Sequence, residues 1–327
     1  SVMQRTGGLD WSTQPKVFKH YPDAVNLPLP APLELAGVST GEAIEAARTA
    51  VFDFLPQPIT LEELSTLLYM TNGVTRLVRY PGLMHYLRAA PSAGALYPTV
   101  TYLVVRDVTG LDPGLYHYDV RGHALNLLRA DRSLYRELAA LTAYQQLIEH
   151  APVTFVFSTI FFRSSWKYKE RSYRYCLLDA GHLAVQTSLT AAALRMGSVP
   201  LGRFADTALN SLLALEEGKE GALLLLPVGR PLAAAQPAAT SNGFISQPKE
   251  LNGEAHQLVH LMHGNTYLQL SGEAVKQRSA TAPLDKPYPE STRIPLAAER
   301  ASGDDLLATI RRRRSTRRWQ DVALSAG

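Results

Sequence analysis

Cysteine and long apolar runs are what this 327-residue chain most clearly lacks. Cys176 is its single cysteine, which excludes a disulfide framework and a thiolate-rich metal site and suits a reducing compartment. No apolar run reaches the roughly 18 residues of a membrane-spanning helix, and the first residues lack the layout of a secretory signal. The 22 glycines and 21 prolines follow no short period, which excludes collagen-like and low-complexity chains. The sequence therefore predicts a cytoplasmic protein with no membrane contact.

Charge of one sign is also scarce. Thirty-three Lys and Arg against 29 Asp and Glu give a net charge of +4, too little to predict nucleic-acid binding. Most of the excess lies in one run, Arg311 to Arg314 with Arg317 and Arg318. Apolar residues make up 46% of the chain and charged residues 19%. This composition excludes general disorder and supplies a sizeable core.

The hydrophobic pattern predicts a mixture of helices and strands. One helix begins after Thr60, which caps it together with Glu63, and ends at Gly73. The other elements follow from apolar runs and periodicity: strands at 99–107, 151–162 and 222–229, a hairpin over 114–129 that turns at Arg121–Gly122, and helices near 132–148 and over 173–196.

The chain divides into four segments, of which the last repeats the first. Residues 1–36 are Pro-rich and irregular and predict an extended arm over a domain that spans 37–232, followed by a linker with surface helices over 233–285. In the segment 286–327, KPYPESTRIPLA (286–297) resembles KHYPDAVNLPLP (19–30). The match continues by pairing Ile44 with Ile310 and Thr49 with Ser315. We interpret 286–327 as the start of a second copy of the fold, with chance similarity of Pro-rich segments as the alternative.

The most informative stretch for function is RAAPSAGALYP, residues 88–98. The small residues Ser92, Ala93 and Gly94 let the backbone approach a planar or phosphorylated ligand closely. Pro91 fixes the direction of the chain before them, and Arg88 supplies a positive charge. The alternative is an ordinary turn before a strand, which needs neither the arginine nor the prolines.

Four motifs in order carry a resemblance to a known family: RAAPSAGALYP, GLYHYD, YRYCLLDAGHLAVQ and PVG. The series resembles the nitroreductase-like flavoproteins, and more narrowly the dehydrogenases that oxidise azolines to azoles in thiazole- and oxazole-modified peptides. The resemblance covers about residues 10–230. It implies an α+β fold, a nitroreductase-like mixed sheet surrounded by helices, with FMN and the long helix at a dimer interface. It also implies that the PSAGALYP segment faces the flavin of the opposite subunit.

A second constellation, Lys167–Tyr168, precedes the long predicted helix and follows a buried strand, where active-site loops tend to lie. Azoline oxidases carry a Lys–Tyr pair at this place, so the resemblance implies that both residues are catalytic. Azoline oxidation removes a hydride, which a flavin accepts, and a proton from the neighbouring carbon. Desolvation lowers the pKa of an ammonium group, which makes a lysine an effective base. Tyr168 would position the substrate or share the proton; a solvated surface pair is the alternative.

The resemblance also assigns residues after the long helix. Leu201 and Gly202 match a loop whose backbone N–H groups face the flavin N5 and O4, and Arg230 either reaches the phosphate or stays on the surface. Asp179 and His182 are not predicted to form a metal or triad site, because no further ligand and no nucleophile motif accompanies them. The resemblance places them in a buried structural helix in which Gly181 packs closely. No metal is predicted.

The phosphate site departs from the family pattern, which is R-x-S-x-R at the first helix, with both arginines and the serine on the FMN phosphate. The first copy has Arg48 and Thr49 with Val51 in place of the second arginine, whereas the second copy keeps Arg313, Ser315 and Arg317. The flavin is therefore held either in the degraded first-copy pocket or by the second copy together with PSAGALYP of the first. The presence of Lys167–Tyr168 and Gly202 in the first copy favours the first arrangement.

The sequence thus predicts an FMN-dependent dehydrogenase that oxidises azoline rings of a modified peptide or a carrier-bound intermediate. Its expected assembly is a homodimer or an intramolecular pseudo-dimer of tandem copies. One alternative is a generic flavin reductase that takes NAD(P)H and reduces nitroarenes or quinones, a reaction that needs no base at a substrate carbon. The other is a degenerate, non-catalytic half that completes the flavin site of its neighbour.

Overall fold

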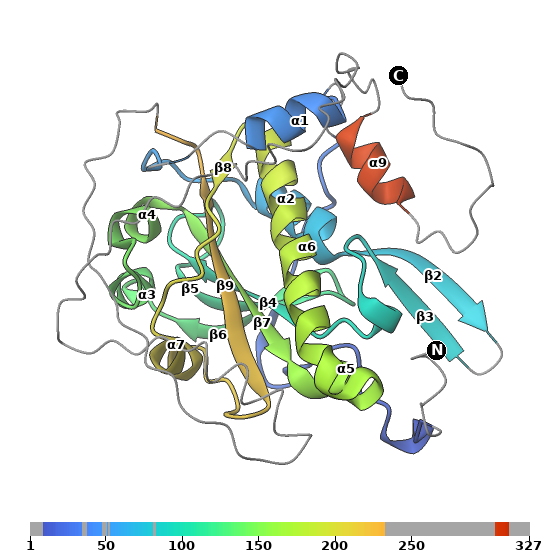
Figure 1. Cartoon of the computed structure of the whole chain (residues 1–327). Helices are drawn as coiled ribbons and strands as arrows, with labels where there is room; N and C mark the ends of the chain where they lie inside the picture. The colour runs from blue at the N-terminus through green and yellow to red at the C-terminus, as the bar shows by residue number, and fades with distance from the viewer. Residues whose placement is uncertain are drawn as a thin grey trace, which may run out of the picture.

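The computed structural model describes residues 9–34, 38–47, 51, 53–80, 83–232 and 305–313. Figure 1 shows a central sheet with the long helix α6 (Ser172–Ala193) on one face and the shorter helices α3 (Leu134–Ala140), α4 (Gln145–His150) and α7 (Asp206–Leu212) on the other. This arrangement confirms the predicted α+β fold. Within the described residues, no helix is long and apolar enough to span a membrane.

The central sheet has seven strands. In spatial order they are β1 (Val25–Pro28), β6 (Ala124–Ala130), β5 (Gly114–Asp119), β4 (Thr99–Val105), β7 (Val153–Ile160), β9 (Glu220–Gly229) and β8 (Gly197–Ser198). Strand β4 is buried along its whole length and β7 along nearly all of it, which explains why both have continuous apolar sequences. The predicted strands and the predicted hairpin are confirmed.

Alternation along β4 divides the interior into two cores. Leu103 and Val105 point into the core beneath α6 and α2 (Leu61–Asn72), whereas Tyr102 and Val104 point into the core beneath α3 and α7. The sheet therefore stands between two apolar layers, and the residues at its ends are held on both sides.

The helices follow the sequence signals with one exception. Thr60 and Glu63 form the predicted capping box of α2, and Gly73 ends the helix as predicted. The predicted helix over 132–148 is wrong, because the chain forms α3 and α4 with a break between them. At the break, Leu141 accepts a hydrogen bond from the Ala205 backbone and Thr142 forms a β-bridge with Phe204, so these backbone groups are not available to a helix.

A hairpin that the sequence analysis did not identify projects from the domain (Figure 1). It consists of β2 (Val74–Tyr80) and β3 (Leu83–Arg88), which pair only with each other among the described strands. Leu77 and Met84 are 50% and 42% exposed on it. Because neither face of this hairpin enters the main cores, its sequence lacks the strong apolar signal of the central strands.

The described part of the arm is tied to the domain at both ends. Trp166 donates from Nε1 to the Asp10 carbonyl at 3.1 Å, and its ring meets the ring of Trp11 edge-on at 5.5 Å. Further along, β1 adds an edge strand to β6, so the arm is more regular than its Pro-rich sequence predicts.

Two short helices from opposite ends of the chain begin side by side. The helix α1 (Thr40–Ala47) follows Ser39 and α9 (Leu306–Arg312) follows Asp305, and Ser39 and Asp305 form an antiparallel bridge. Each of these residues caps its own helix, because Ser39 accepts from the Glu42 backbone and Asp305 from the Ala308 backbone. Ala43 of α1 and Ile310 of α9 share one apolar cluster.

Candidate functional site

The structure brings the two strongest sequence motifs together. A Cβ atom placed on Gly94 would lie 2.8 Å from the Tyr168 hydroxyl oxygen and 3.1 Å from Lys167 Nζ. Gly94 itself has a φ of +66°, a conformation that favours glycine. The turn that precedes β4 and the end of the helix that follows β7 therefore meet at one point, which we call the Gly94 corner: Gly94, Lys167, Tyr168 and Asp179.

The turn at the Gly94 corner stores backbone strain. Besides Gly94, Ala95 and Tyr97 have positive φ angles of 55° and 46°. The Ser92 side chain accepts a hydrogen bond from the Tyr97 backbone at 2.9 Å, which closes the turn. Two non-glycine residues in the left-handed region within three positions are costly, and such strain concentrates at functional sites.

Lys167 and Tyr168 lie on a helix and not on the predicted loop. They end α5 (Phe161–Tyr168), which begins directly after β7, and Lys169 with a φ of +49° terminates it. A lysine in the last turn is favoured by the partial negative charge of a helix C-terminus. Both side chains are half-buried, and the Tyr168 ring packs on Tyr175 at 4.6 Å. Burial, with smaller contributions from Tyr175 and Asp179, raises the pKa of the Tyr168 hydroxyl.

The Asp179 carboxylate holds the turn through hydrogen bonds. Its Oδ1 accepts a hydrogen bond from the Ala93 backbone at 3.4 Å, and Ser92 also donates to the carboxylate. The side chain is 5% exposed, and its Oδ2 has no hydrogen-bond partner within the described residues. Burial raises the pKa of Asp179 to about 6, against hydrogen bonds that lower it. The sequence analysis did not identify Asp179 as a site residue, because the turn that it holds lies far away in the chain.

A groove of about 530 Å³ opens beside the turn. It runs between the arm segment 14–20, strand β3 and the turn residues 94–97. Lys16, His20, His85 and Arg121 line it, and Asp119 is its one carboxylate among the described lining residues. Its size fits a ligand of several residues, and its charge favours an acidic one.

Arg88 points into the protein. It is 2% exposed, donates to the Val17 carbonyl at 2.7 Å and to Asn72 Oδ1 at 3.2 Å, and stacks on the Tyr97 ring. Its guanidinium group therefore supports the arm and the turn from inside. Pro91, Ser92 and Ala93 are partly exposed on the turn itself.

Arg313, which follows α9, reaches the same corner. Its Nε donates to the Ala89 carbonyl at 3.0 Å and its Nη2 to the Arg88 carbonyl at 3.3 Å, two and three residues before Pro91. Helix α9 thus delivers the first arginine of the intact R-x-S-x-R motif to the turn. Ser315 and Arg317 lie outside the described residues, as do Arg48 and Thr49 of the first copy.

The side chains at the opposite end of α6 differ from those at the Gly94 corner. A Cβ on Gly197 would lie 2.4 Å from a methyl group of Val51, so the valine side chain packs directly on this glycine. Arg230 donates to Glu63 Oε1 at 2.7 Å, an ion pair with the capping box of α2. We call this region the Val51 end: Val51, Gly197, Arg230 and Glu63. A cavity of about 450 Å³ adjoins it, lined by Glu42 and Arg195 among others.

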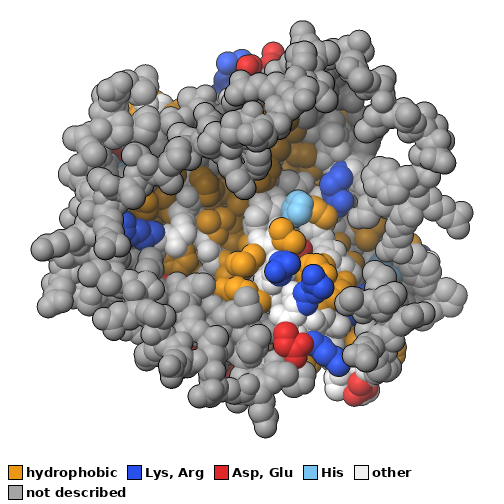
Figure 2. Space-filling model, in the orientation of Figure 1, with side chains coloured by type: hydrophobic (Ala, Val, Ile, Leu, Met, Phe, Trp, Pro, Cys, Tyr) orange, Lys and Arg blue, Asp and Glu red, His pale blue; other side chains and the backbone are white. Residues whose placement is uncertain are grey.

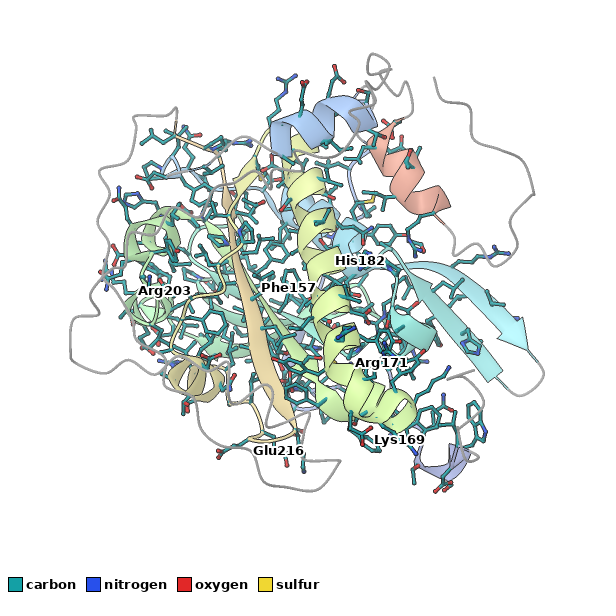
Figure 3. All side chains as sticks on the ribbon, in the orientation of Figure 1. Phe157, Lys169, Arg171, His182, Arg203 and Glu216 are labelled. Atoms are coloured by element: carbon teal, nitrogen blue, oxygen red, sulfur yellow. The ribbon has the colours of Figure 1, made fainter. Side chains whose placement is uncertain are left out.

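Leu201 and Gly202 do not join the Gly94 corner. The Leu201 backbone pairs with Leu225, and its side chain lies in the core beneath α3 and α7. Figure 3 shows Arg203, the next residue, on the opposite side of the sheet from Lys169. Among the described residues, no atom lies within 4 Å of a Cβ placed on Gly202.

One face of α6 is exposed and apolar, contrary to the expectation of a buried structural helix. Leu177, Leu178 and Val185 are 47%, 53% and 58% exposed, and no described atom lies within 4 Å of a Cβ placed on Gly181. His182 lies on the same face, with Nδ1 near the Leu178 carbonyl (Figure 3). Figure 2 shows hydrophobic side chains on this side of the molecule next to a group of Lys and Arg. Leu177, Leu178 and Val185 thus place apolar side chains on the exposed face of α6 as well as on its buried face, a pattern typical of a helix that packs on both sides.

Known proteins with similar sequences and structures support the fold described above. Residues 46–230 match the Nitroreductase family. A candidate nitroreductase of Methanocaldococcus jannaschii is 34% identical over 191 residues, which cover 58% of this chain and 91% of that protein. The trifolitoxin-processing protein TfxB of Rhizobium leguminosarum bv. trifolii is 30% identical over 181 residues, which cover 54% of this chain and 48% of that protein.

A solved structure extends the similarity to nearly the whole chain. The crystal structure of a candidate nitroreductase from Anabaena variabilis superimposes on this chain with a TM-score of 0.75. The two sequences are 27% identical, and the superposition covers 95% of this chain. The chain spans 60% of that structure's chain and about half the length of TfxB.

Proposed function

Because the chain belongs to the nitroreductase family of oxidoreductases, we propose that it is an FMN-dependent dehydrogenase that oxidises azoline rings of a modified peptide or a carrier-bound intermediate to azoles. The observation that carries the proposal is the Gly94 corner. An amine and a phenol lie within about 3 Å of the position of a Gly94 Cβ, on the turn that the resemblance assigns to the flavin. A reductase that acts on nitroarenes or quinones needs no such base at a substrate carbon.

The described residues fit a flavin. Because Gly94 has no side chain, the Tyr168 hydroxyl group and Lys167 Nζ lie directly against the backbone of the turn, and a planar ring bound to the turn would meet both groups. Ser92, Ala93 and Gly94 would hold the ring system, and Arg313 would bring charge toward the phosphate. When bound, FMN supplies the hydride acceptor.

The chain's own groups handle the proton. Lys167 Nζ takes the proton from the ring carbon next to the one that loses hydride, so the azoline loses two hydrogens in all. Tyr168 orients the ring through its hydroxyl group, whose raised pKa keeps it protonated and able to donate. Asp179 holds the turn so that both groups face the same point.

We infer that the flavin at this corner is held by the second copy. The Arg313 side chain is hydrogen-bonded to the carbonyls two and three residues before Pro91, whereas at the Val51 end the second arginine is absent and Arg230 is engaged by Glu63. The bridge between Ser39 and Asp305 supports the same assembly. It joins equivalent positions of the two copies in the register that pairs Ile44 with Ile310, as a local two-fold axis requires. A second copy of the fold would then cover the exposed face of α6.

The groove beside the turn supports a peptide substrate. It leads along the arm and β3 to Gly94 and carries more positive than negative side chains. TfxB, by its name, processes trifolitoxin. Binding of an acidic peptide segment here would weaken with salt, because exposed charges are screened within about 10 Å at 0.1 M ionic strength.

Mass spectrometry of an azoline-containing peptide incubated with the FMN-loaded protein tests the proposal. The expected result is the loss of two hydrogens per ring. Rapid NAD(P)H consumption with a quinone or a nitroarene, and no change in the peptide, would instead identify a generic reductase. Protein that takes up no FMN and leaves the peptide unchanged would identify a non-catalytic half.

A further inference from the structure

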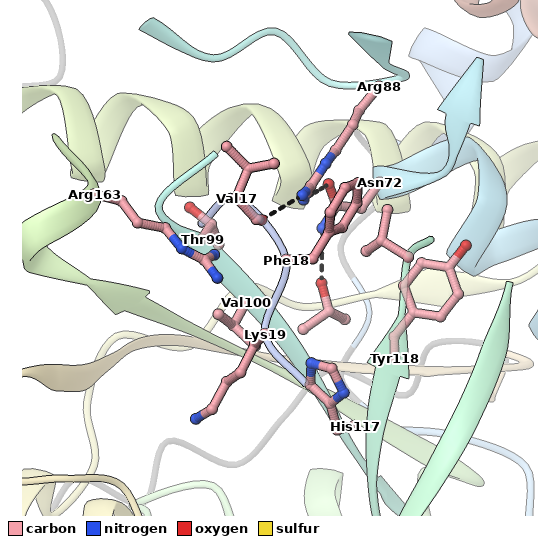
Figure 4. Close-up of a pocket in the computed structure, with 12 residues that line it drawn as sticks. Val17, Phe18, Lys19, Asn72, Arg88, Thr99, Val100, His117, Tyr118 and Arg163 are labelled. Carbon is pink, nitrogen blue, oxygen red and sulfur yellow. Dashed lines mark hydrogen bonds between the residues drawn. The ribbon is translucent and has the colours of Figure 1, made fainter. Parts of the chain in front are cut away.

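A small pocket lined by buried side chains lies beneath the arm segment 17–19, apart from the Gly94 corner. Its volume is about 10 Å³, room for one water-sized body. Figure 4 shows Arg88 and Arg163 reaching toward the arm segment from opposite sides, with Thr99 and His117 near it. Buried, positively charged side chains surround this cavity.

Both arginines are buried without a carboxylate of their own. Arg88 and Arg163 are 2% and 4% exposed, and neither takes part in an ion pair between described residues. Arg163 donates to the Tyr97 carbonyl at 2.9 Å, and Arg88 donates to a carbonyl and an amide. Buried charges of this kind are normally paired.

Glu220 is the one buried carboxylate near the cavity among the described residues, and it already accepts hydrogen bonds from other groups. Glu220 accepts from Lys19 at 2.5 Å, from Ser158 at 2.6 Å and from Tyr102 at 3.0 Å. Three cations, Lys19 and the two arginines, thus share one anion. Although burial lowers the pKa of Arg88 to about 9 and that of Arg163 to about 10, both remain charged at neutral pH.

Two donors at the cavity have no acceptor. Arg88 Nε and Thr99 Oγ1 are buried, line the cavity and have no hydrogen-bond partner within the described residues. A guanidinium group only donates, so whatever fills this space must accept hydrogen bonds. His117 adds no positive charge, because burial and neighbouring cations lower its pKa to about 3.

We propose that this cavity binds a single-atom anion of the halide class, held by Arg88, Arg163 and the Thr99 hydroxyl group. A water molecule also fits by size, but it would leave two guanidinium charges uncompensated and would need acceptors for its own hydrogens. Sulfate and phosphate exceed the space. The bound anion neutralises buried charge and satisfies the orphaned donors at once.

The anion also connects to the turn at the Gly94 corner. The Arg88 guanidinium stacks 4.3 Å from the centre of the Tyr97 ring, and Arg163 donates to the Tyr97 carbonyl. Tyr97 is one of the strained residues of the turn. An anion that compensates the charges of Arg88 and Arg163 therefore stabilises the conformation of Tyr97, the last residue of the turn.

Thermal unfolding in sodium bromide against sodium methanesulfonate at equal ionic strength tests the proposal. Above the dissociation constant, Tm should rise by about 2 °C for each tenfold increase in bromide and should not respond to methanesulfonate. Thr99→Val should weaken the bromide response and Arg163→Met should abolish it. Arg106→Met is the control, because Arg106 is half-buried and donates to the carbonyls of Ala151 and His150, away from the cavity. Equal Tm values in the two salts would overturn the proposal.

Crystals grown in bromide give a direct readout that does not depend on the variants folding. An anomalous peak between Arg88, Arg163 and Thr99 is the expected result. Ordered water or an empty cavity at this place, with bromide present in the crystal, would overturn the halide site.

Discussion

The two ends of α6 differ in what they offer a flavin. At the Gly94 corner, a left-handed glycine, an amine and a phenol converge, and Arg313 donates to the carbonyls just before the turn. At the Val51 end, a valine methyl group packs on Gly197 and Arg230 is held by Glu63. The first region brings together an amine and a phenol, whereas at the second a valine stands where the R-x-S-x-R pattern has an arginine and the nearby arginine is paired with a carboxylate.

If the segment 286–327 begins a second copy of the fold, as we propose, this difference predicts that the two copies supply different parts of one flavin site. A homodimer of identical chains would have to repeat both regions, so a defect at the phosphate motif would weaken every site. In a tandem chain, the second copy can supply the phosphate contacts while the first supplies Lys167 and Tyr168. Loss of the arginine at position 51 is then harmless, because the Val51 end no longer carries the function.

The largest effect is expected for Lys167→Ala, which removes the base from the Gly94 corner. Azole formation should fall by at least about 100-fold, while FMN occupancy stays unchanged, because general-base catalysis supplies roughly 10²–10⁴-fold. Peptide mass spectrometry and the flavin absorbance of the same sample provide the two readouts. Lys219→Ala is the control, since Lys219 is an exposed lysine far along the chain. Turnover like the wild type in Lys167→Ala would remove this residue from the mechanism.

Gly94→Val should produce the next largest effect. The new side chain would collide with the Tyr168 hydroxyl group and Lys167 Nζ, and flavin binding and azole formation should both fall. Gly110→Val is a matched control, because Gly110 also has a positive φ, +82°, but no atom lies within 4 Å of its Cβ position. Both variants should lose about 1–2 kcal/mol of stability through backbone strain. If both retain flavin equally, the turn is only structural.

Asp179→Asn should change the pH dependence of stability. The pKa of Asp179 is raised from 3.8 to about 6 in the folded protein, so between these values the folded state binds more protons at this group than the unfolded state. The free energy of unfolding of the wild type, relative to Asp179→Asn, should therefore fall as pH rises from about 4 to about 6. The total change should be about 3 kcal/mol and should level off above about pH 7. Parallel urea-unfolding series give the difference, and a flat difference would contradict the assignment.

Local signals in the sequence were sufficient for the elements of the main sheet. The capping residues Thr60 and Glu63 and the continuous apolar sequence of β7 mark their elements without any tertiary information. The β2–β3 hairpin and the break between α3 and α4 were not predictable in this way. The first lies outside both cores, and the second depends on backbone pairing with residues more than 60 positions away.

The candidate site was predictable in its members but not in its geometry. Lys167, Tyr168 and Gly94 were identified separately, and only the fold shows that they meet. Asp179 was set aside because a carboxylate next to a histidine in a helix gives no sign of the distant turn that it holds. Gly181 was expected to pack closely, yet it lies on the open face of α6, because a sequence does not distinguish packing within a fold from packing against another copy.

The smallest effect is expected at the Val51 end, for Arg230→Ala. Since Arg230 is engaged by Glu63 and is partly exposed, the variant should lose only about 0.5–1 kcal/mol of stability. Its FMN affinity should equal that of the wild type, measured by quenching of flavin fluorescence. Markedly weaker FMN binding in this variant would show that the Val51 end still holds the phosphate.

The central claim is that the second copy's motif holds the flavin at the Gly94 corner. Fluorescence titration of FMN with Arg313→Ala, Arg317→Ala and Arg48→Ala compares the loss of one arginine from the segment 313–317 with the loss of one from the segment 48–51. The account predicts that the dissociation constant rises at least about tenfold for Arg313→Ala and Arg317→Ala, since a hydrogen bond to a charged group contributes about 1.5–3 kcal/mol, and stays unchanged for Arg48→Ala. Weakened binding for Arg48→Ala alone would contradict it and place the flavin in the first-copy pocket.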